Sequence, residues 1–257
     1  MSSTPAEVEL IDIDLAFGGL AVLTDVSFTV EAGAIAAVIG PNGAGKTSIF
    51  NCLSGIYRPD GGQIFVDGEK LTGRRPPAIA DLGVARTFQN LALFDNLDVV
   101  DNLMLGRHRH IRTGLLAGAV WIGRAKSEEH RHRAYCDEIV ELLELGAVAR
   151  EPVGALPYGT RKRIEIGRAL AMEPRVLLLD EPVAGMNTDE TAELRNIISA
   201  VHRERPVTIM VVEHDMAFVG ELAEEIIVLD HGEVIASGDP TTVRADPEVI
   251  RAYLGGA

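Results

Sequence analysis

Runs of apolar residues alternate with amphipathic stretches along this chain, and their spacing predicts both strands and helices. Residues 8–15 alternate apolar with polar positions, which is the period of a half-buried strand. Three continuous apolar runs, 34–39, 176–179 and 207–212, predict strands that are buried on both faces. Further strands are predicted at 22–30, 63–66, 83–88, 226–229 and 234–236, the last two joined by the turn His231-Gly232, and helices at 45–55, 98–145 with a Gly-rich interruption at 114–123, and 189–201. Buried strands that alternate with helices predict an α/β fold with a mostly parallel sheet.

Composition narrows the classes of protein that this chain can be. Its 257 residues, 47% of them hydrophobic, are enough for one large α/β domain or two modest ones. The net charge of −14 argues against a surface that grips nucleic acid. The longest apolar stretch, at 115–122, is far shorter than the roughly 18 residues that cross a bilayer. Because residues 1–9 carry no secretory pattern and two cysteines make no disulfide framework, a cytoplasmic location is expected.

A glycine-rich stretch after the first buried strand predicts a phosphate-binding loop. Residues 40–47 read Gly-Pro-Asn-Gly-Ala-Gly-Lys-Thr, which fits G-x-x-x-x-G-K-[ST] between a strand and a helix. Glycines allow backbone amides to wrap phosphates, and the amino end of the helix favours an anion. Lys46 is predicted to neutralise the β- and γ-phosphates of ATP, and the Thr47 hydroxyl to bind Mg²⁺.

Two adjacent carboxylates follow the second buried strand. The run Val176-Leu-Leu-Leu-Asp180-Glu181 delivers both acids at the carboxyl end of a strand, where α/β sheets bind ligands. Asp180 is predicted to hold Mg²⁺, usually through water, and Glu181 to polarise the attacking water.

Between these two motifs the chain resembles the ATP-binding cassette (ABC) ATPases. Leu156-Pro157-Tyr158-Gly159-Thr160 stands where that superfamily has its Leu-Ser-Gly-Gly-Gln signature, about twenty residues before the paired carboxylates. Other superfamily motifs appear in order, namely Phe17 for the aromatic that stacks on adenine, Gln89 in Arg-Thr-Phe-Gln-Asn, the dimer-contact loop at 184–187, and His214 for the switch histidine.

The resemblance implies a fold, a set of site residues and two bound species. It implies a P-loop NTPase core with a mostly parallel sheet and an antiparallel β portion, made of residues 1–90 and 174–257, and a helical signature subdomain at about 91–173. The implied bound species are ATP and Mg²⁺. Implied catalytic residues are Glu181, His214, Gln89 and Lys46; implied metal-binding residues are Thr47, Gln89 and Asp180; and implied nucleotide-binding residues are Phe17, Gly40, Pro41, Asn42, Gly43, Ala44, Gly45, Lys46, Thr47, Ser48, Leu156, Pro157, Tyr158, Gly159 and Thr160.

Within the superfamily the chain is most similar to the ATPase subunits of branched-chain amino acid uptake transporters. Residues 85–90, Glu213-His-Asp-Met216 and the closing stretch 246–254 carry this narrower likeness, which related cassettes for urea, amides or other amino acids share. It implies a second ATPase subunit in a heterodimer, two membrane permeases, a separate solute-binding protein, no nucleic acid, and a peripheral place on the cytoplasmic face of the membrane. Two alternatives stay open: a lipid or lipopolysaccharide exporter, and a soluble mechanoenzyme in DNA repair or translation. A small-molecule kinase would not explain residues 156–160.

The signature departs from the family pattern at two positions. Pro157 replaces the serine and Thr160 the glutamine, so the hydroxyl and amide donors of that serine to the opposite γ-phosphate are missing. Since the signature serves the partner's ATP, this predicts an unequal pair of sites in a heterodimer.

Basic residues gather between Leu105 and Tyr135. This window holds seven Lys or Arg against two acids, together with four of the seven histidines, in a chain of net charge −14. It is interpreted either as a solvated surface or as a patch facing anionic lipid or a partner. On the second interpretation, neutralising Arg107, Arg109 and Arg112 weakens membrane assembly and leaves ATP binding unchanged.

Overall fold

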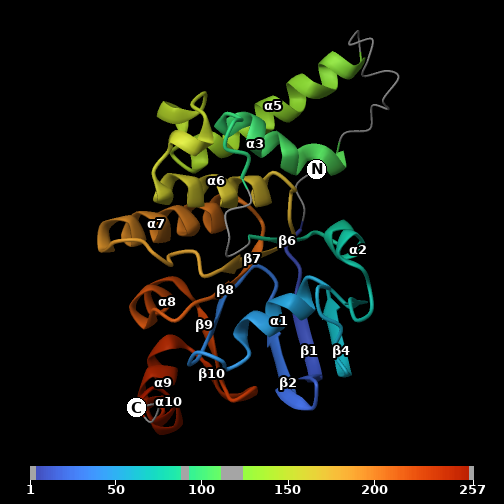
Figure 1. Ribbon diagram of the computed structural model, residues 1–257, viewed down its shortest axis with the longest axis vertical. Helices are drawn as coiled ribbons and strands as arrows, with labels where there is room; N and C mark the ends of the chain where they lie inside the picture. The colour runs from blue at the N-terminus through green and yellow to red at the C-terminus, as the bar shows by residue number, and fades with distance from the viewer. Residues whose placement is uncertain (1–3, 88–92, 111–123, 255–257) are drawn as a thin grey trace.

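The computed structural model describes residues 4–87, 93–110 and 124–254, and it contains two sheets with helices packed on them (Figure 1). The smaller sheet is antiparallel, in the order β2-β1-β4-β5. The larger sheet has the order β10-β9-β3-β8-β7-β6, in which β9 and β10 are antiparallel and the other neighbours are parallel. This arrangement confirms the α/β fold with a mostly parallel sheet and an antiparallel portion near the N-terminus.

The observed elements match most of the predicted ranges. The strands are β1 Val8–Phe17, β2 Leu20–Val30, β3 Ile35–Ile39, β4 Gly61–Val66, β5 Glu69–Lys70, β6 Val84–Arg86, β7 Val176–Asp180, β8 Thr208–Val212, β9 Glu225–Asp230 and β10 Glu233–Gly238. The α-helices are α1 Lys46–Leu53, α2 Pro76–Asp81, α3 Val99–Gly106, α5 Arg124–Leu142, α6 Tyr158–Leu170, α7 Thr188–Glu204, α8 Met216–Leu222, α9 Pro240–Ala245 and α10 Pro247–Leu254. Short 3-10 helices are η1 Arg107–His110, η2 Gly146–Val148 and η3 Val153–Ala155. The apolar spacing did not predict α2, α8, α9 or α10, because each has at most eight residues and offers too few turns for a helical period. It did not predict the longer α6 either, which was expected only from the resemblance, as part of the helical signature subdomain.

The central strands are apolar throughout because each of their faces belongs to a different core. In β3, Ile35, Ala37 and Ile39 pack in one hydrophobic cluster, whereas Ala36 and Val38 pack in the other. The first cluster includes residues of α3, α5, α6, α7 and α8, and the second includes α1 and the antiparallel sheet. Both faces are therefore covered, and the strands show no alternation of apolar and polar residues.

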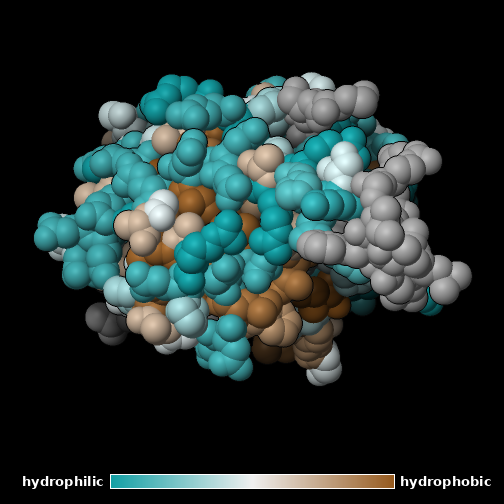
Figure 2. All heavy atoms as spheres, turned by 90° about the horizontal axis from the view of Figure 1, so that it is seen from above, coloured by the Kyte–Doolittle hydropathy of each residue, from teal (hydrophilic) through white to brown (hydrophobic). Residues whose placement is uncertain are grey.

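Close backbone approach ties the helices above the sheet together. A Cβ placed on Gly106, the last residue of α3, would lie 2.3 Å from the Arg168 carbonyl oxygen of α6. Helices α3, α5 and α6 lie together at one end of the molecule, and the C-terminal helices α9 and α10 lie at the other end beside β10 (Figure 1). Seen from the helical end, the surface is mostly hydrophilic, with hydrophobic side chains showing in the hollows (Figure 2). Within the described ranges, no helix is both long and apolar enough to cross a membrane.

Candidate functional site

The predicted phosphate-binding loop joins β3 to the first turn of α1. Gly40 has φ 149°, and a Cβ there would lie 2.1 Å from the Leu229 carbonyl oxygen of the neighbouring strand β9. Gly45, with φ 104°, caps α1 in the left-handed region, where L-residues are strained. Glycine is therefore required at both positions by the path of the chain, and the amino end of α1 opens toward the loop.

Lys46 is the first residue of α1 and folds back over this loop. Its Nζ donates hydrogen bonds to the carbonyl oxygens of Gly40 and Pro41, at 2.7 and 2.9 Å. Burial lowers the pKa of Lys46, and the negative charges of Glu181 and Glu213 oppose that shift. The next residues of α1 are less enclosed, since Thr47 is exposed and Ser48 is half-buried.

Strand register brings the other charged residues to the same edge of the sheet. Strand β8 lies between β3 and β7, and Val212 pairs with both Val38 and Asp180. The residues that follow Val38, Asp180 and Val212 along their strands therefore end at one edge. That edge holds the phosphate-binding loop, Glu181 and His214, as the strand patterns predict.

Asp180 is buried in an ion pair that the sequence did not predict. Its Oδ2 lies 2.6 Å from Arg86 Nη2, and the two side chains are 3% and 6% exposed. Arg86 Nη1 also donates to Asn51 Oδ1 of α1 at 2.8 Å and to Ser54 Oγ at 2.9 Å. One guanidinium thus ties the ends of β6, β7 and α1 together beside the loop.

Glu181 stands at the turn after β7 in an unusual backbone conformation. Its φ is 45°, in the left-handed region, which costs of order 1 kcal/mol for a non-glycine residue. Its amide donates to the Val212 carbonyl at 2.9 Å, which joins the end of β7 to the end of β8. The side chain is half-buried. A carboxylate held in this way can accept a proton from a water molecule at the sheet edge.

His214 and the buried Glu213 lie at the end of β8. The imidazole of His214 is 60% exposed, whereas the Glu213 side chain is fully buried. Glu213 accepts hydrogen bonds from the amides of Val183 and His214, at 3.1 and 3.0 Å. Burial raises the pKa of Glu213, and these two hydrogen bonds counteract the shift.

Phe17 lies at the end of β1, where an aromatic ring was expected to stack on adenine. It is 47% exposed, and its ring meets that of Tyr57 edge to face at a centroid distance of 5.0 Å. Tyr57 therefore restrains the ring of Phe17, which stays about half exposed. Tyr57 lies forty residues further along the chain and belongs to no motif, so this contact was not predicted from the sequence.

The signature segment packs against the start of α7. Pro157 is the residue before α6, with φ −56° and ψ 155°, and its side chain makes no capping hydrogen bond. A Cβ on Gly185 would lie 3.7 Å from Tyr158 Cε1, and a Cβ on Gly159 would lie 3.3 Å from Glu190 Oε1. Leu156 is buried in the core, Pro157 and Tyr158 are exposed, and Thr160 is half-buried. Gln89 lies outside the described residues.

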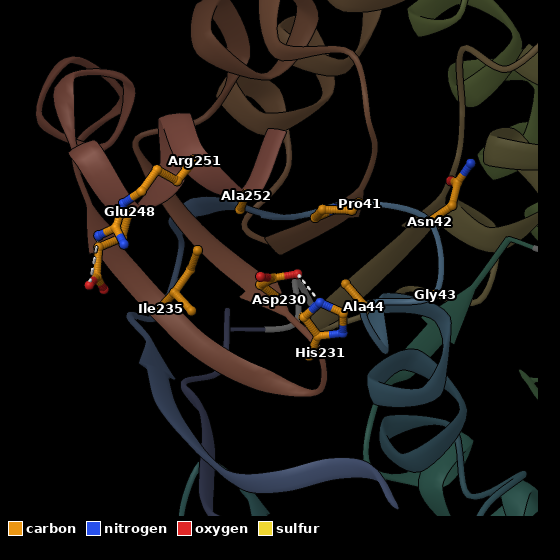
Figure 3. Close-up of a pocket in the computed structure, with 10 residues that line it drawn as sticks. All are labelled: Pro41, Asn42, Gly43, Ala44, Asp230, His231, Ile235, Glu248, Arg251 and Ala252. Carbon is orange, nitrogen blue, oxygen red and sulfur yellow. Dashed lines mark hydrogen bonds and ion pairs between the residues drawn. The ribbon is translucent and has the colours of Figure 1, made fainter. Parts of the chain in front are cut away.

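A cavity of about 890 Å³ lies between the phosphate-binding loop and the C-terminal helix α10 (Figure 3). Its lining is Pro41, Asn42, Gly43, Ala44, Asp230, His231, Ile235, Glu248, Arg251 and Ala252. Of the predicted site it includes the four loop residues 41–44, and Lys46, Asp180 and Glu181 are not part of its lining. The hollow therefore adjoins the charged edge of the sheet and does not coincide with it.

The basic window is mostly engaged within the molecule where the structure describes it. Arg107 is 5% exposed and donates to His132 Nδ1, the Ala171 carbonyl and Glu173 Oε1. Arg109 pairs with Asp81, and Arg133 with Asp101 and Glu129. Burial and the Arg107 charge lower the pKa of His132. Arg107, Arg109 and Arg133 thus form ion pairs within the chain. Arg112 lies outside the described residues.

The donor types at the sheet edge fit Mg²⁺. Thr47, an exposed residue, has a hydroxyl, and Asp180 has a carboxylate whose Oδ2 is paired with Arg86; both are the hard oxygen ligands that Mg²⁺ prefers. Across the described part of the chain, no group of three or more His, Cys, Asp or Glu residues could hold a metal ion. Such a small set agrees with Mg²⁺ chemistry, because this ion is usually held by one or two protein ligands together with phosphates and water.

Comparison with known proteins shows which family has this arrangement of residues. The family model of the ABC transporter matches residues 23–184. The chain belongs to the ABC transporter family. A second model, for the branched-chain amino acid ATP-binding cassette transporter, matches residues 233–257 of the cassette.

Individual relatives cover nearly the whole cassette. It is 41% identical over 250 residues to the high-affinity branched-chain amino acid transport ATP-binding protein BraF of Pseudomonas aeruginosa, covering 97% of this chain and 98% of BraF. It is also 41% identical over 244 residues to LivG of Escherichia coli, which carries the same description, covering 94% of each chain. Among solved structures, an ABC transporter cassette in its ADP conformation aligns with a TM-score of 0.84 at 28% identity, covering 98% of this chain and all of the other, and a nucleotide-free cassette aligns with a TM-score of 0.82 at 27% identity, covering 97% and 99%. The cassette is therefore a nucleotide-binding ATPase of the ABC transporter family.

Sequence reasoning missed the residues that support this site. Arg86 and Glu213 stand inside stretches that carry the family resemblance, but neither was given a role and their burial was not predicted. The available signal was a charged residue directly at the end of an apolar strand, because such a residue must find a partner when the strand is buried on both faces.

Proposed function

We propose that this cassette powers the import of branched-chain amino acids or related small polar solutes through membrane permeases. The observation that carries the proposal is the 41% identity to BraF and LivG along nearly the whole chain. The match of residues 233–257 to the branched-chain amino acid cassette model supports it independently, because this segment lies outside the general cassette match.

The residues at the sheet edge are assigned roles in ATP hydrolysis. The loop amides of residues 40–47 and the Lys46 ammonium bind the phosphates, and the exposed part of the Phe17 ring takes the adenine. Thr47, Gln89 and Asp180 would hold Mg²⁺, which would supply positive charge against the phosphate oxygens. Glu181 accepts a proton from the attacking water, and His214 orients this water and the γ-phosphate.

The signature segment acts on the ATP of a partner subunit. Its contacts within the chain are with Gly185 and Glu190 at the start of α7, and the exposed faces of Pro157 and Tyr158 are open to a second cassette. We assign this chain to a heterodimer on two permeases with a separate solute-binding protein, at the cytoplasmic face of the membrane. Residues 91–173 form the helical subdomain, and residues 1–90 with 174–257 form the core.

The test is ATP turnover by the assembled transporter. We expect the cassette to co-purify with two permeases when they are co-expressed, and its turnover in proteoliposomes to rise when leucine, isoleucine or valine and a loaded binding protein are added. Stimulation by lipid with no response to amino acids would contradict the import assignment and favour an exporter. Recovery of the cassette on DNA or ribosomes, without permeases, would favour a soluble mechanoenzyme.

A catalytic variant supplies the control for this experiment. Glu181→Gln keeps the shape of the side chain and removes the base, so turnover should fall about 10²–10⁴-fold while ATP binding is retained. Turnover of the variant that persists near the wild-type rate would contradict the role given to Glu181.

A further inference from the structure

A fully buried carboxylate lies between the two loops that carry Glu181 and His214, and no motif assigns it a task. Glu213 is the first residue after β8, and its side chain is 0% exposed. Burying a carboxylate costs free energy unless hydrogen bonds compensate for the lost water. The buried position of Glu213 therefore requires hydrogen-bond partners that offset the free energy of burial.

The two oxygens of Glu213 bind two different loops. Oε1 accepts the amide proton of Val183, two residues after Glu181 in the turn that follows β7, at 3.1 Å. Oε2 accepts the amide proton of His214 at 3.0 Å and lies 3.5 Å from its Nδ1. Each contact needs an acceptor, and a carboxylate has two acceptor oxygens, whereas a glutamine amide has only one.

Charge connects the same residue to the phosphate-binding loop. The negative charges of Glu181 and Glu213 both raise the pKa of Lys46 against the effect of burial. Glu181 in turn raises the pKa of Glu213, and His214 lowers it. Glu213 therefore lies within electrostatic range of Lys46, Glu181 and His214.

We propose that Glu213 is a positioning residue for ATP hydrolysis, which holds Glu181 and His214 at a fixed separation by binding the backbone of both loops. The proposal rests on the roles given above to Glu181 and His214. Glu213 acts through the backbone of these two loops, because its own side chain is fully buried.

The first test is Glu213→Gln in the complete transporter complex. We expect kcat for ATP to fall about 10–100-fold, as for a misplaced reacting group, while KM and ATP binding change less than about threefold. Glu165→Gln, which alters another buried glutamate, paired with Lys162 on α6, is the matched control. If Glu213→Gln retains the wild-type kcat, or if Glu165→Gln loses as much, the proposal is wrong.

A double-mutant cycle separates positioning from general support of the fold. In a His214→Ala background, Glu213→Gln should lower kcat by less than half of its effect, in logarithmic terms, in the wild-type background, because part of its target is gone. Fully additive losses would overturn the proposal. If Glu213→Gln yields no folded protein, Glu213→Asp replaces it in both arms, since it keeps two acceptors but withdraws them by one methylene. Basal turnover decides this question, whereas the import assignment depends on stimulation by amino acids, so the two can fail separately.

Discussion

At the residue scale, buried charges at strand ends organise the site. Arg86 and Asp180 form an ion pair with side chains 6% and 3% exposed, and Glu213 is fully buried one strand away. The sheet edge is therefore held by one motif residue, Asp180, and by two residues that have no assigned role in nucleotide binding, Arg86 and Glu213. Such residues carry the geometry on which the motif residues depend.

The Arg86 pair leads to a prediction about stability. Replacing Arg86 by Leu leaves the Asp180 carboxylate buried without its cation, so the free energy of unfolding should fall by about 3–5 kcal/mol. Urea unfolding followed by circular dichroism measures the change. Adding Asp180→Asn to this variant should restore part of the loss, because the uncompensated charge is then removed.

A surface pair provides the control. Arg251 and Glu248 pair on α10 with side chains 73% and 61% exposed, so Arg251→Leu should change the free energy of unfolding by less than about 1 kcal/mol. An equal loss in the Arg86 and Arg251 variants would show that burial of the first pair has no energetic consequence.

At the element scale, the C-terminal helix α9 is attached to α8, the helix that follows His214. Arg244 of α9 donates to the carbonyl oxygen of Met216, and its guanidinium lies where a side chain at position 220 would be. A Cβ on Gly220 would lie 1.7 Å from Arg244 Nη2. Glycine in the middle of α8 is therefore explained by the arginine that crosses it.

This contact predicts coupling between positions 220 and 244. Gly→Ala inside a helix ordinarily stabilises by about 1 kcal/mol. In the wild-type background that gain should be cancelled by displacement of Arg244, which loses a hydrogen bond worth about 1 kcal/mol. In an Arg244→Ala background, Gly220→Ala should stabilise by the full amount.

Thermal and urea unfolding of the wild type, the two single variants and the double variant measures that coupling. The same effect of Gly220→Ala in both backgrounds would mean that the guanidinium moves aside without cost, and that α9 does not constrain α8.

At the scale of the whole molecule, the signature segment and the basic window are the two regions that bear on contacts with partner subunits or lipid. Pro157 precedes α6 without a side-chain cap, in an exposed position. The basic window contains Arg107, which is buried on His132 and Glu173, so neutralising it would perturb folding as well as any docking. Lys126 and Arg131 of α5 are exposed cations of this window and are better sites for probing a lipid or partner contact.

Pro157 yields the prediction at this scale. Pro157→Ser should supply the missing cap of α6, worth about 1 kcal/mol, and should restore hydroxyl and amide donors toward the nucleotide of the partner. We expect ATP turnover of the assembled transporter to rise, with little change in the isolated subunit. A gain in the stability of the subunit with no change in complex turnover would count against unequal sites in the heterodimer.

The α/β fold, the succession of most strands and longer helices along the chain, and the phosphate-binding loop could be predicted from the sequence. Apolar runs buried on both faces and a glycine loop before a helix are local patterns, and local patterns are legible without a structure. The short helices α2, α8, α9 and α10 could not be predicted in this way, because packing rather than periodicity stabilises them.

By itself, the sequence determined which groups are available: a lysine and a threonine after a glycine loop, two carboxylates after one strand, and a histidine after another. Only the tertiary structure decided which of them meet and what holds them. Register between β3, β8 and β7 places their ends together, and Arg86 and Glu213 bind those ends across gaps of 94 and 30 residues. The physical reason is that a buried charged group needs a partner that is close in space, and the separation of two residues along the chain does not show whether they are close in space.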